Sequence, residues 1–142
     1  MSQLPLIGWR EWVSFPDMNI RRIKCKIDTG ARTSSLHASN IEPEHEHKIV
    51  RFTVSPFRKQ PEIQNICTAS LIGFRDVKNS GGQLERRYVI ETLLRIGTQE
   101  WPIEVTLTDR STMRFRMLLG RTAMQRHVII DPAKSYLAGK PL

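Results

Sequence analysis

Alternation of apolar and polar residues with a period of two dominates the chain and predicts β-strands. Apolar side chains alternate with charged or polar ones over Ile23–Ile27, over Val50–Val54 and through most of Val89–Leu107. The last stretch contains Gly97-Thr98, a dipeptide suited to a tight turn, and therefore predicts a hairpin of two long strands. A helix is indicated only over the short segment Thr122–Arg126. The pattern as a whole predicts an all-β protein with one short helix.

The segments between these strands carry turn and loop residues. Pro43–His47 and Ser55–Gln64 are polar or contain proline, which predicts loops, and Asn79-Ser80-Gly81-Gly82 is a turn signal between strand-like segments. A chain of 142 residues fits the ordinary size of one domain. We therefore expect residues 1–142 to form a single domain, whose central folded part runs from about residue 6 to residue 137.

The clearest chemical signal is Ile27-Asp28-Thr29-Gly30-Ala31, where an alternating strand runs into a carboxylate, a hydroxyl and a glycine. Asp-Thr-Gly is by itself a weak signal, because Asp and Gly are also common in the turn that ends a strand. Its context adds weight, since two apolar residues and a glycine follow much later in Leu118-Leu119-Gly120-Arg121. Leu118 and Leu119 are expected to be core residues whether or not the site is catalytic.

Four separated motifs resemble, in the same order, those of a bacterial retropepsin-like aspartic peptidase family. They are Gly8–Glu11, Lys26–Ser34, Arg114–Arg121 and Asp131-Pro132. Members of this family are commonly labelled ATP-dependent zinc proteases and are associated with ATP-grasp ligases of the RimK type. The resemblance covers nearly the whole chain, and several motifs in order are far more specific than any one of them. It implies a closed acid-protease (retropepsin-like) barrel, in which the Leu-Leu-Gly strand crosses beneath the catalytic loop.

The same resemblance implies an aspartic peptidase whose active site lies on the two-fold axis of a homodimer. The mechanism needs two carboxylates that share a proton: the ionised one activates water, and the protonated one polarises the scissile carbonyl. The chain has one Asp-Thr-Gly, so a second copy would supply the other Asp28. Thr29 would hydrogen-bond across the axis, and Gly30 would let the two loops approach closely.

Further residues receive roles from the same resemblance. Ala31 and Arg32 would adjoin the substrate. Many retropepsins have no arginine so near the catalytic aspartate, and Arg32 could favour the ionised carboxylates or bind an acidic substrate. The expected supports of the catalytic loop are Leu118, Leu119, Gly120 and Arg121.

Retropepsins close over a peptide with a hairpin flap, and Asp76–Tyr88 is the segment that we expect to do so. Its turn at Ser80-Gly81-Gly82 is rich in glycine and can move to admit substrate. Arg86, Arg87 and Tyr88 at its base would contact substrate or face solvent. The alternative is an ordinary exposed hairpin.

The net charge is +8 at pH 7, which favours acidic partners. The basic residues are scattered, with short clusters at Arg21–Lys24 and Arg86-Arg87, and no aromatic stacking motif is interleaved with them. Solvated strand faces are therefore the favoured interpretation, and nucleic acid is not an expected partner. The expected substrate is a peptide or protein, and an acidic one would suit the charge.

The N-terminal segment lacks the uninterrupted apolar stretch of a secretory signal, and no apolar run approaches the roughly 20 residues that cross a bilayer. We therefore expect a cytoplasmic protein without a membrane segment. Cys25 and Cys67 lie in apolar alternating stretches, which predicts reduced, buried thiols rather than a disulfide framework.

A zinc peptidase would carry a His-Glu-x-x-His helix or another cluster of three ligands, and the sequence has no such motif. His45 and His47 fall in a charged loop, and His37 is interpreted as a hydrogen-bonded structural histidine. The sequence also lacks a phosphate-binding glycine loop. Because both kinds of motif are absent, neither a metal nor a nucleotide cofactor is expected. Any ATP dependence would come from an associated ATP-grasp ligase, and a peptidase that trims acidic tails added by such a ligase would fit the basic surface.

Three functions remain open. The first is a dimeric aspartic endopeptidase. The second is a non-catalytic module of the same fold that binds an acidic peptide or partner, and the third is the zinc metallopeptidase of the family label. Loss of activity on replacing Asp28, binding without turnover, and sensitivity to a chelator distinguish the three.

Overall fold

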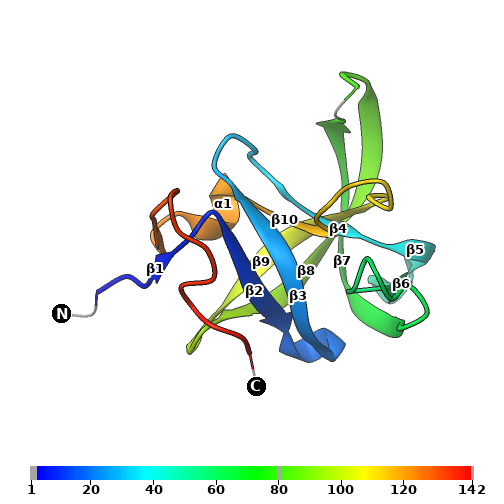
Figure 1. The fold of residues 1–142 in the computed structure, drawn as a ribbon. Helices are drawn as coiled ribbons and strands as arrows, with labels where there is room; N and C mark the ends of the chain where they lie inside the picture. Colours follow the sequence, from blue (N-terminus) through cyan, green and yellow to red (C-terminus); the bar gives the residue numbers. More distant parts are fainter. Residues whose placement is uncertain (1–2, 80, 142) are drawn as a thin grey trace.

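The computed structural model describes residues 3–79 and 81–141, and its regular secondary structure is almost entirely β-strand (Figure 1). Among the described residues, no helix is both long and apolar enough to cross a membrane. The predicted all-β class with one short helix is confirmed. In chain order the elements are β1 (Leu6–Ile7), β2 (Arg10–Phe15), the 3-10 helix η1 (Pro16–Met18), β3 (Ile20–Asp28), β4 (Ser34–His37), β5 (Ser39–Glu44), β6 (Ile49–Val54), β7 (Asn65–Lys78), β8 (Leu84–Ile96), β9 (Gln99–Thr108), β10 (Met117–Gly120), α1 (Arg121–Met124) and β11 (Ile129–Ile130).

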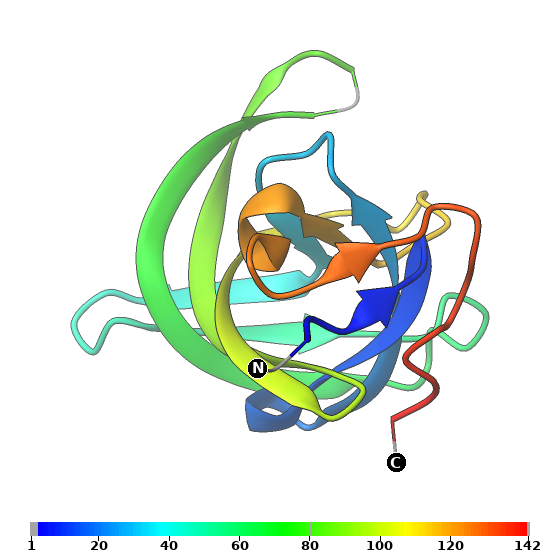
Figure 2. The ribbon, with the colours of Figure 1, turned by 90° about the vertical axis from the view of Figure 1, so that its left-hand side faces the viewer.

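Six of the strands close into a barrel. The main sheet runs in the order β2-β3-β10-β4-β9-β8-β7-β6-β5, and an additional pairing joins β2 to β8 at Ser14 and Arg95. That pairing closes the ring from β2 to β8, and Figure 2 shows how the strands curve around it. Strands β7, β6 and β5 continue the sheet beyond the ring, and β1 pairs with β11 in a separate parallel ribbon.

The apolar residues of the alternating strands fill the interior of the barrel. On β3, Cys25 and Ile27 are buried, whereas Lys24 and Lys26 are exposed, because successive side chains of a strand point to opposite faces. Cys67 is also buried, and burial raises its pKa to about 11, so that the thiol stays protonated at neutral pH. The prediction of free, buried cysteines is confirmed.

Two further local predictions are confirmed, one of them with shifted bounds. Strands β8 and β9 form the predicted hairpin, with Ile96 paired to Gln99 across a turn in which Gly97 has a φ of +59°, a conformation that suits glycine. The short helix lies at Arg121–Met124 rather than at residues 122–126. It ends there because Gln125 adopts an extended ψ of 128°.

The prediction of a loop over Pro43–His47 is wrong at its start. Strand β5 extends through Pro43 and Glu44, paired with β6, and the turn occupies residues 45–48. The last strand of the sheet is β5, where a proline without an N–H group is tolerated. The other predicted loop, Ser55–Gln64, does connect β6 to β7.

A buried carboxylate ties both ends of the chain to the barrel. Glu11 on β2 is fully buried and accepts hydrogen bonds from the N–H groups of Gly8 (2.7 Å), Leu137 (2.8 Å) and Ala138 (3.1 Å). A buried charge is stable only when it is hydrogen-bonded, and these three backbone donors meet that need. The contact explains in structural terms why the Gly8–Glu11 motif occurs at the start of β2.

Replacing Glu11 by glutamine is expected to lower the free energy of unfolding by about 2 kcal/mol. The amide offers one acceptor oxygen in place of two and directs an NH2 group at backbone donors. Chemical denaturation followed by tryptophan fluorescence measures the change. The exposed Glu62→Gln variant is the control, with an expected change within about 0.5 kcal/mol. Equal midpoints for both variants would contradict the structural role of Glu11.

Candidate active site

Asp28 is the last residue of β3, and its own turn orients the carboxylate. Asp28 Oδ1 accepts hydrogen bonds from the N–H groups of Gly30 (3.0 Å) and Ala31 (3.2 Å). A Cβ on residue 30 would lie 3.3 Å from the same oxygen, so glycine suits this tight turn. The backbone that follows Asp28 therefore sets the direction of its carboxylate. The residue itself is half-buried.

Strand β10 lies between the two strands that flank the Asp28 loop. It pairs in parallel with β3, where Gly120 is opposite Asp28, and antiparallel with β4. The N–H group of Gly120 donates to Ser34 Oγ over 3.0 Å. A Cβ on residue 120 would lie 2.5 Å from the carbonyl carbon and oxygen of Thr33, so glycine alone fits this crossing. The geometry agrees with the expected passage of the Leu-Leu-Gly strand beneath the loop.

The residues that follow β10 hold the carbonyl groups of the Asp28 loop. Arg121 donates from Nη1 to the Thr29 carbonyl (3.0 Å) and from its N–H group to the Ala31 carbonyl (2.7 Å). Thr122 donates from Oγ1 to the Arg32 carbonyl over 2.8 Å. The position of Asp28 therefore depends on contacts with a segment that lies far away in the sequence.

The Asp28 carboxylate opens into a cleft of about 730 Å³, called here the Asp28 cleft. Its walls come from the Asp28 loop with β3, β4 and β10, from the β7–β8 hairpin, and from the segment between β9 and β10. The predicted flap hairpin and the predicted catalytic residue thus line one cleft. The lining residues are Lys26, Asp28, Ala31, Thr33, Ser35, Val77, Lys78, Asn79, Gly81, Gln83, Glu85, Arg87, Thr108, Asp109, Arg110, Thr112, Met113 and Leu118.

Arg87 is a buried cation in the wall of the cleft. Its Nη1 donates to Ser35 Oγ over 3.1 Å, and its Nε lies 3.3 Å from Glu85 Oε1. Glu85 also accepts a hydrogen bond from Thr108 Oγ1 (2.5 Å). This hydrogen bond, together with the nearby Arg87, holds the pKa of Glu85 below its usual value. The cleft wall therefore contains an ionised pair at neutral pH.

Arg110 brings a further cation to the cleft. Burial lowers its pKa and the Arg87 guanidinium adds to that effect, whereas the Asp28 carboxylate opposes it. An arginine nevertheless stays charged at neutral pH, so Arg110 contributes a positive field close to Asp28.

His37 has a structural contact, as the sequence interpretation proposed. Its Nδ1 accepts the N–H group of Arg110 over 2.8 Å, which requires that nitrogen to be unprotonated. Burial, reinforced by the Arg116 guanidinium, lowers the pKa of His37. The ring is therefore neutral near pH 7 and positions the segment that carries Arg110.

The structure divides the predicted site residues between the cleft and its surroundings. Those that line the Asp28 cleft are Asp28, Ala31, Gly81, Arg87 and Leu118. Those that are exposed outside it are Thr29, Gly30, Arg32, Gly82 and Arg121. Leu119 and Gly120 are buried beneath the loop. The expectation of a core position is wrong for Leu118, which is half-buried and faces the cleft because it lies on the opposite side of β10 from Leu119. Ser80, at the predicted tip of the flap, lies outside the described residues.

The predicted residues at the base of the hairpin point to both faces of β8. Arg87 turns into the Asp28 cleft, whereas Arg86 is exposed with its Nε 3.4 Å from Asp76 Oδ1. Tyr88 is half-buried and packs against Phe74, with ring centroids 4.8 Å apart. Alternation along a strand requires this separation, so only Arg87 of the three adjoins the cleft.

The side chains that could bind a metal ion are those of the acidic, histidine and cysteine residues. Within residues 3–79 and 81–141, no group of three or more of them is placed to hold a metal ion. His45 and His47 are exposed in the turn after β5, and His47 Nδ1 lies 2.5 Å from Glu44 Oε1.

Sequence reasoning missed several residues of the cleft, among them Lys26, Ser35, Glu85 and Arg110. A signal for Lys26 existed, because it lies two positions before Asp28 and therefore on the same face of the strand. Glu85 had a similar signal, because it lies within the predicted flap segment two positions before Arg87. Arg110 had none, since it reaches the cleft only through the pairing of distant strands.

Comparison with known proteins agrees with this geometry. The model of the RimB-like family, described as "Retropepsin-like aspartic endopeptidase RimB", matches residues 6–141. The chain belongs to the RimB-like family. The retropepsin-like resemblance inferred from the four sequence motifs is thereby confirmed, as is the barrel expected of a RimB-like chain.

This RimB-like chain is also similar to proteins named "Probable alpha-L-glutamate ligase". It is 40% identical over 137 residues to the protein of Shewanella halifaxensis and 44% identical over 137 residues to that of Desulfotalea psychrophila. Each match covers 95% of this chain, which spans about 30% of the length of these relatives. The crystal structure of a protein of unknown function from Legionella pneumophila is similar to it, with a TM-score of 0.79 and 26% identity over 94% of this chain and 98% of that one.

Proposed function

We propose that the chain is one subunit of a homodimeric aspartic endopeptidase that cleaves acidic peptides. The observation that carries the proposal is a single half-site, in which one Asp-Thr-Gly turn, held by β10 and Arg121, presents its carboxylate to a large cleft. Membership of a family described as retropepsin-like aspartic endopeptidases supports it.

A two-fold axis beside the loop would place the Asp28 carboxylates of two subunits face to face. Two carboxylates so close share one proton. The ionised one takes a proton from water, which attacks the scissile carbonyl carbon, while the protonated one donates a hydrogen bond to the carbonyl oxygen. Transfer of a proton to the leaving amine then breaks the C–N bond. Thr29 is exposed on the loop, where its hydroxyl can reach a partner loop.

Charge and the similar proteins both support an acidic substrate. Lys26, Arg87 and Arg110 line the Asp28 cleft, and a net charge of +8 raises the local concentration of acidic peptides. The relatives named as glutamate ligases contain a region similar to this chain within a longer protein. We infer that the chain acts on glutamate-rich products of such a ligase, and that this is its functional link to an ATP-grasp enzyme.

The β7–β8 hairpin is proposed to act as the flap. Two residues near its tip, Asn79 and Gly81, line the same cleft as Asp28. Gly82 has a φ of +81°, a conformation that glycine adopts without strain and that permits a sharp turn. Movement of this hairpin would admit a peptide and then exclude water from the dyad.

The activity per subunit toward a glutamate-rich peptide is expected to fall as the protein is diluted into the monomer range, because each subunit holds only one catalytic aspartate. Initial rates measured by mass spectrometry, with the molecular mass measured at the same concentrations, test this dependence. A matched peptide with glutamine in place of glutamate is expected to be cut about tenfold more slowly. A metal chelator is expected to leave the rate unchanged.

Each competing function has its own outcome in this experiment. A rate per subunit that is constant down to the monomer range would contradict the shared site. Binding of the acidic peptide without cleavage, from acidic to neutral pH, would favour a binding module. A rate that falls with chelator and recovers with zinc would favour a metallopeptidase.

A further inference from the structure

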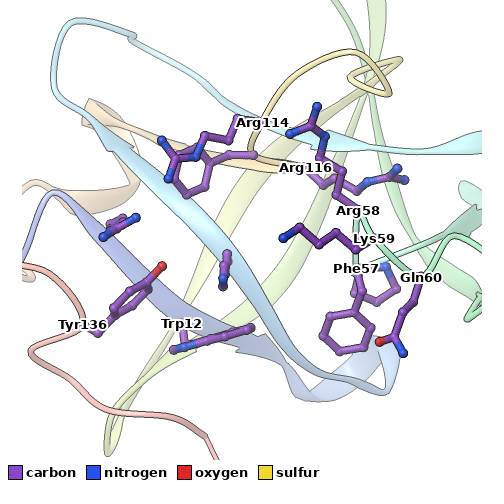
Figure 3. A pocket seen from close by; sticks show the side chains of 12 residues that line it. Trp12, Phe57, Arg58, Lys59, Gln60, Arg114, Arg116 and Tyr136 are labelled. Carbon is purple, nitrogen blue, oxygen red and sulfur yellow. The ribbon is translucent and has the colours of Figure 1, made fainter.

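A second hollow, of about 350 Å³ and called here the basic hollow, lies beside β2 and β3. Other walls come from the loop after β6, the segment before β10 and the C-terminal segment. In Figure 3, Trp12 and Tyr136 lie on one side, the labelled residues from Phe57 to Gln60 on the other, and Arg114 and Arg116 along the upper edge. Of the described residues, none lines both this hollow and the Asp28 cleft.

Positive charge gathers in the basic hollow without a compensating carboxylate. Of the described residues that line it, none is Asp or Glu, and none of its cations forms an ion pair with another described residue. Like charges held close together repel one another, and a bound anion relieves that repulsion. The cations are Arg10, Lys24, Arg58, Lys59, Arg114 and Arg116.

Arg116 is the buried member of this group. The residue is 8% exposed, its Nη1 donates to the Ser55 carbonyl over 3.3 Å, and its Nε has no hydrogen-bond partner among the described residues. A buried donor without a partner destabilises the folded state. Arg116 therefore adds a buried, incompletely paired cation to the wall of the basic hollow.

Of the four aromatic rings that line the basic hollow, those of Trp12, Phe115 and Tyr136 already hold cations. The Arg10 guanidinium carbon lies 5.0 Å from the centre of the Tyr136 ring, and Lys24 Nζ lies 5.2 Å from that of Trp12. Such contacts fix the cations in place. Grooves that bind nucleic acid instead leave ring faces open for bases to stack on. The arrangement therefore favours carboxylates over nucleotides.

A row of side chains connects the basic hollow to the Asp28 cleft. Lys24, Lys26 and Asp28 project from the same face of β3, because they alternate with buried residues. Lys24 lines the basic hollow, whereas Lys26 and Asp28 line the cleft. On an extended strand, Lys24 and Asp28 are separated by roughly 13 Å, which equals about four residues of an extended peptide.

We propose that the basic hollow is an exosite that binds the carboxylates of an acidic peptide whose scissile bond lies at Asp28. The position of the bond rests on the proposed function, whereas binding to the hollow does not depend on cleavage. Its four arginines offer paired N–H donors that match carboxylate oxygens. A peptide that follows β3 away from Asp28 would bring acidic residues about four positions from the scissile bond into the hollow.

The first test measures binding alone, in the Asp28→Asn protein, with a fluorescein-labelled decaglutamate peptide at physiological salt. Fluorescence anisotropy is expected to show that Lys24→Glu combined with Arg114→Glu weakens binding by about 30-fold. The matched control is Arg51→Glu combined with Arg126→Glu, which changes the net charge equally at exposed positions outside both pockets. That control is expected to weaken binding by less than about threefold.

The second test measures cleavage by the otherwise wild-type chain. Lengthening the glutamate run from two to six residues on the side that reaches the hollow is expected to raise kcat/KM by about tenfold. The Lys24→Glu and Arg114→Glu pair is expected to abolish this gain, and to lower kcat/KM for the shorter peptide no more than the Arg51→Glu and Arg126→Glu pair does. Absence of cleavage in every protein would refute the proposed peptidase function, while the binding result would still decide the exosite.

Three results would overturn the exosite. Equal weakening by the two charge-reversal pairs would show that the attraction belongs to the whole basic surface. Binding that is unchanged in the Lys24→Glu and Arg114→Glu pair would place the peptide elsewhere. Tighter binding of a single-stranded RNA of equal length, lost in the same pair, would make the basic hollow a nucleic-acid site.

Discussion

Replacing Asp28 by asparagine is expected to lower kcat/KM for an acidic peptide by about 10⁴-fold or more. The amide cannot take a proton from water, and in a symmetric dimer the substitution removes both carboxylates of the dyad at once. Asparagine preserves the shape of the side chain, so the circular dichroism spectrum and the mass of the dimer are expected to stay unchanged. Cleavage rates from mass spectrometry, measured beside these two properties, check the expectation.

The matched control is Asp17→Asn, at an exposed position on η1, which is expected to keep full activity. Mixing gives a sharper test of the shared site. An excess of Asp28→Asn subunits converts active subunits into heterodimers with one aspartate, so the rate per wild-type subunit is expected to fall. Full activity in the Asp28→Asn protein would rule out the aspartic mechanism.

Replacing Gly120 by alanine is expected to lower the free energy of unfolding by about 3 kcal/mol. The added methyl group would lie 2.5 Å from the carbonyl of Thr33, and backbone atoms at the start of a strand cannot move aside as a flexible side chain can. Because Gly120 is paired with Asp28, the strain is also expected to displace the carboxylate and lower activity by about 10²-fold. Denaturant midpoints and cleavage rates measure the two effects.

Gly81→Ala is the control for stability, because a Cβ there would lie 3.4 Å from Asn79 Oδ1, an ordinary contact at an exposed turn. The expected change in the free energy of unfolding is within about 0.5 kcal/mol. If Gly120→Ala were as stable as this control, the crossing of β10 beneath the loop would be less rigid than the structure indicates.

Features with a short-range cause could be predicted from the sequence. Period-two alternation placed Cys25 and Ile27 in the core, because a strand sends successive side chains to opposite faces whatever it pairs with. The turn at Gly97-Thr98 joins β8 to β9 for an equally local reason, since the hairpin closes through neighbouring residues. The end of β3 at Asp28 is also local, because the carboxylate caps the N–H groups of its own turn.

Features that depend on contacts between distant segments could not be predicted in the same way. Glu11 is charged, yet it is fully buried because backbone donors from both ends of the chain converge on it. Arg87 was expected to contact substrate or face solvent, and the fold removes the second alternative by burying it against Ser35 in the wall of the Asp28 cleft. The sequence shows no aromatic motif interleaved with basic residues, whereas the fold brings Trp12 and Tyr136 together with the cations of the basic hollow.

The sequence by itself thus determined the strand content, the alternating core, the Asp-Thr-Gly turn at Asp28 and the retropepsin-like resemblance that the RimB-like match confirms. These properties follow from residue spacing along one strand or one turn, and spacing can be read without a partner segment. The tertiary structure alone decided which cations surround Asp28, which charges are buried and where the basic hollow forms. Closure of the barrel causes this difference, because it sets residues side by side that the sequence keeps far apart.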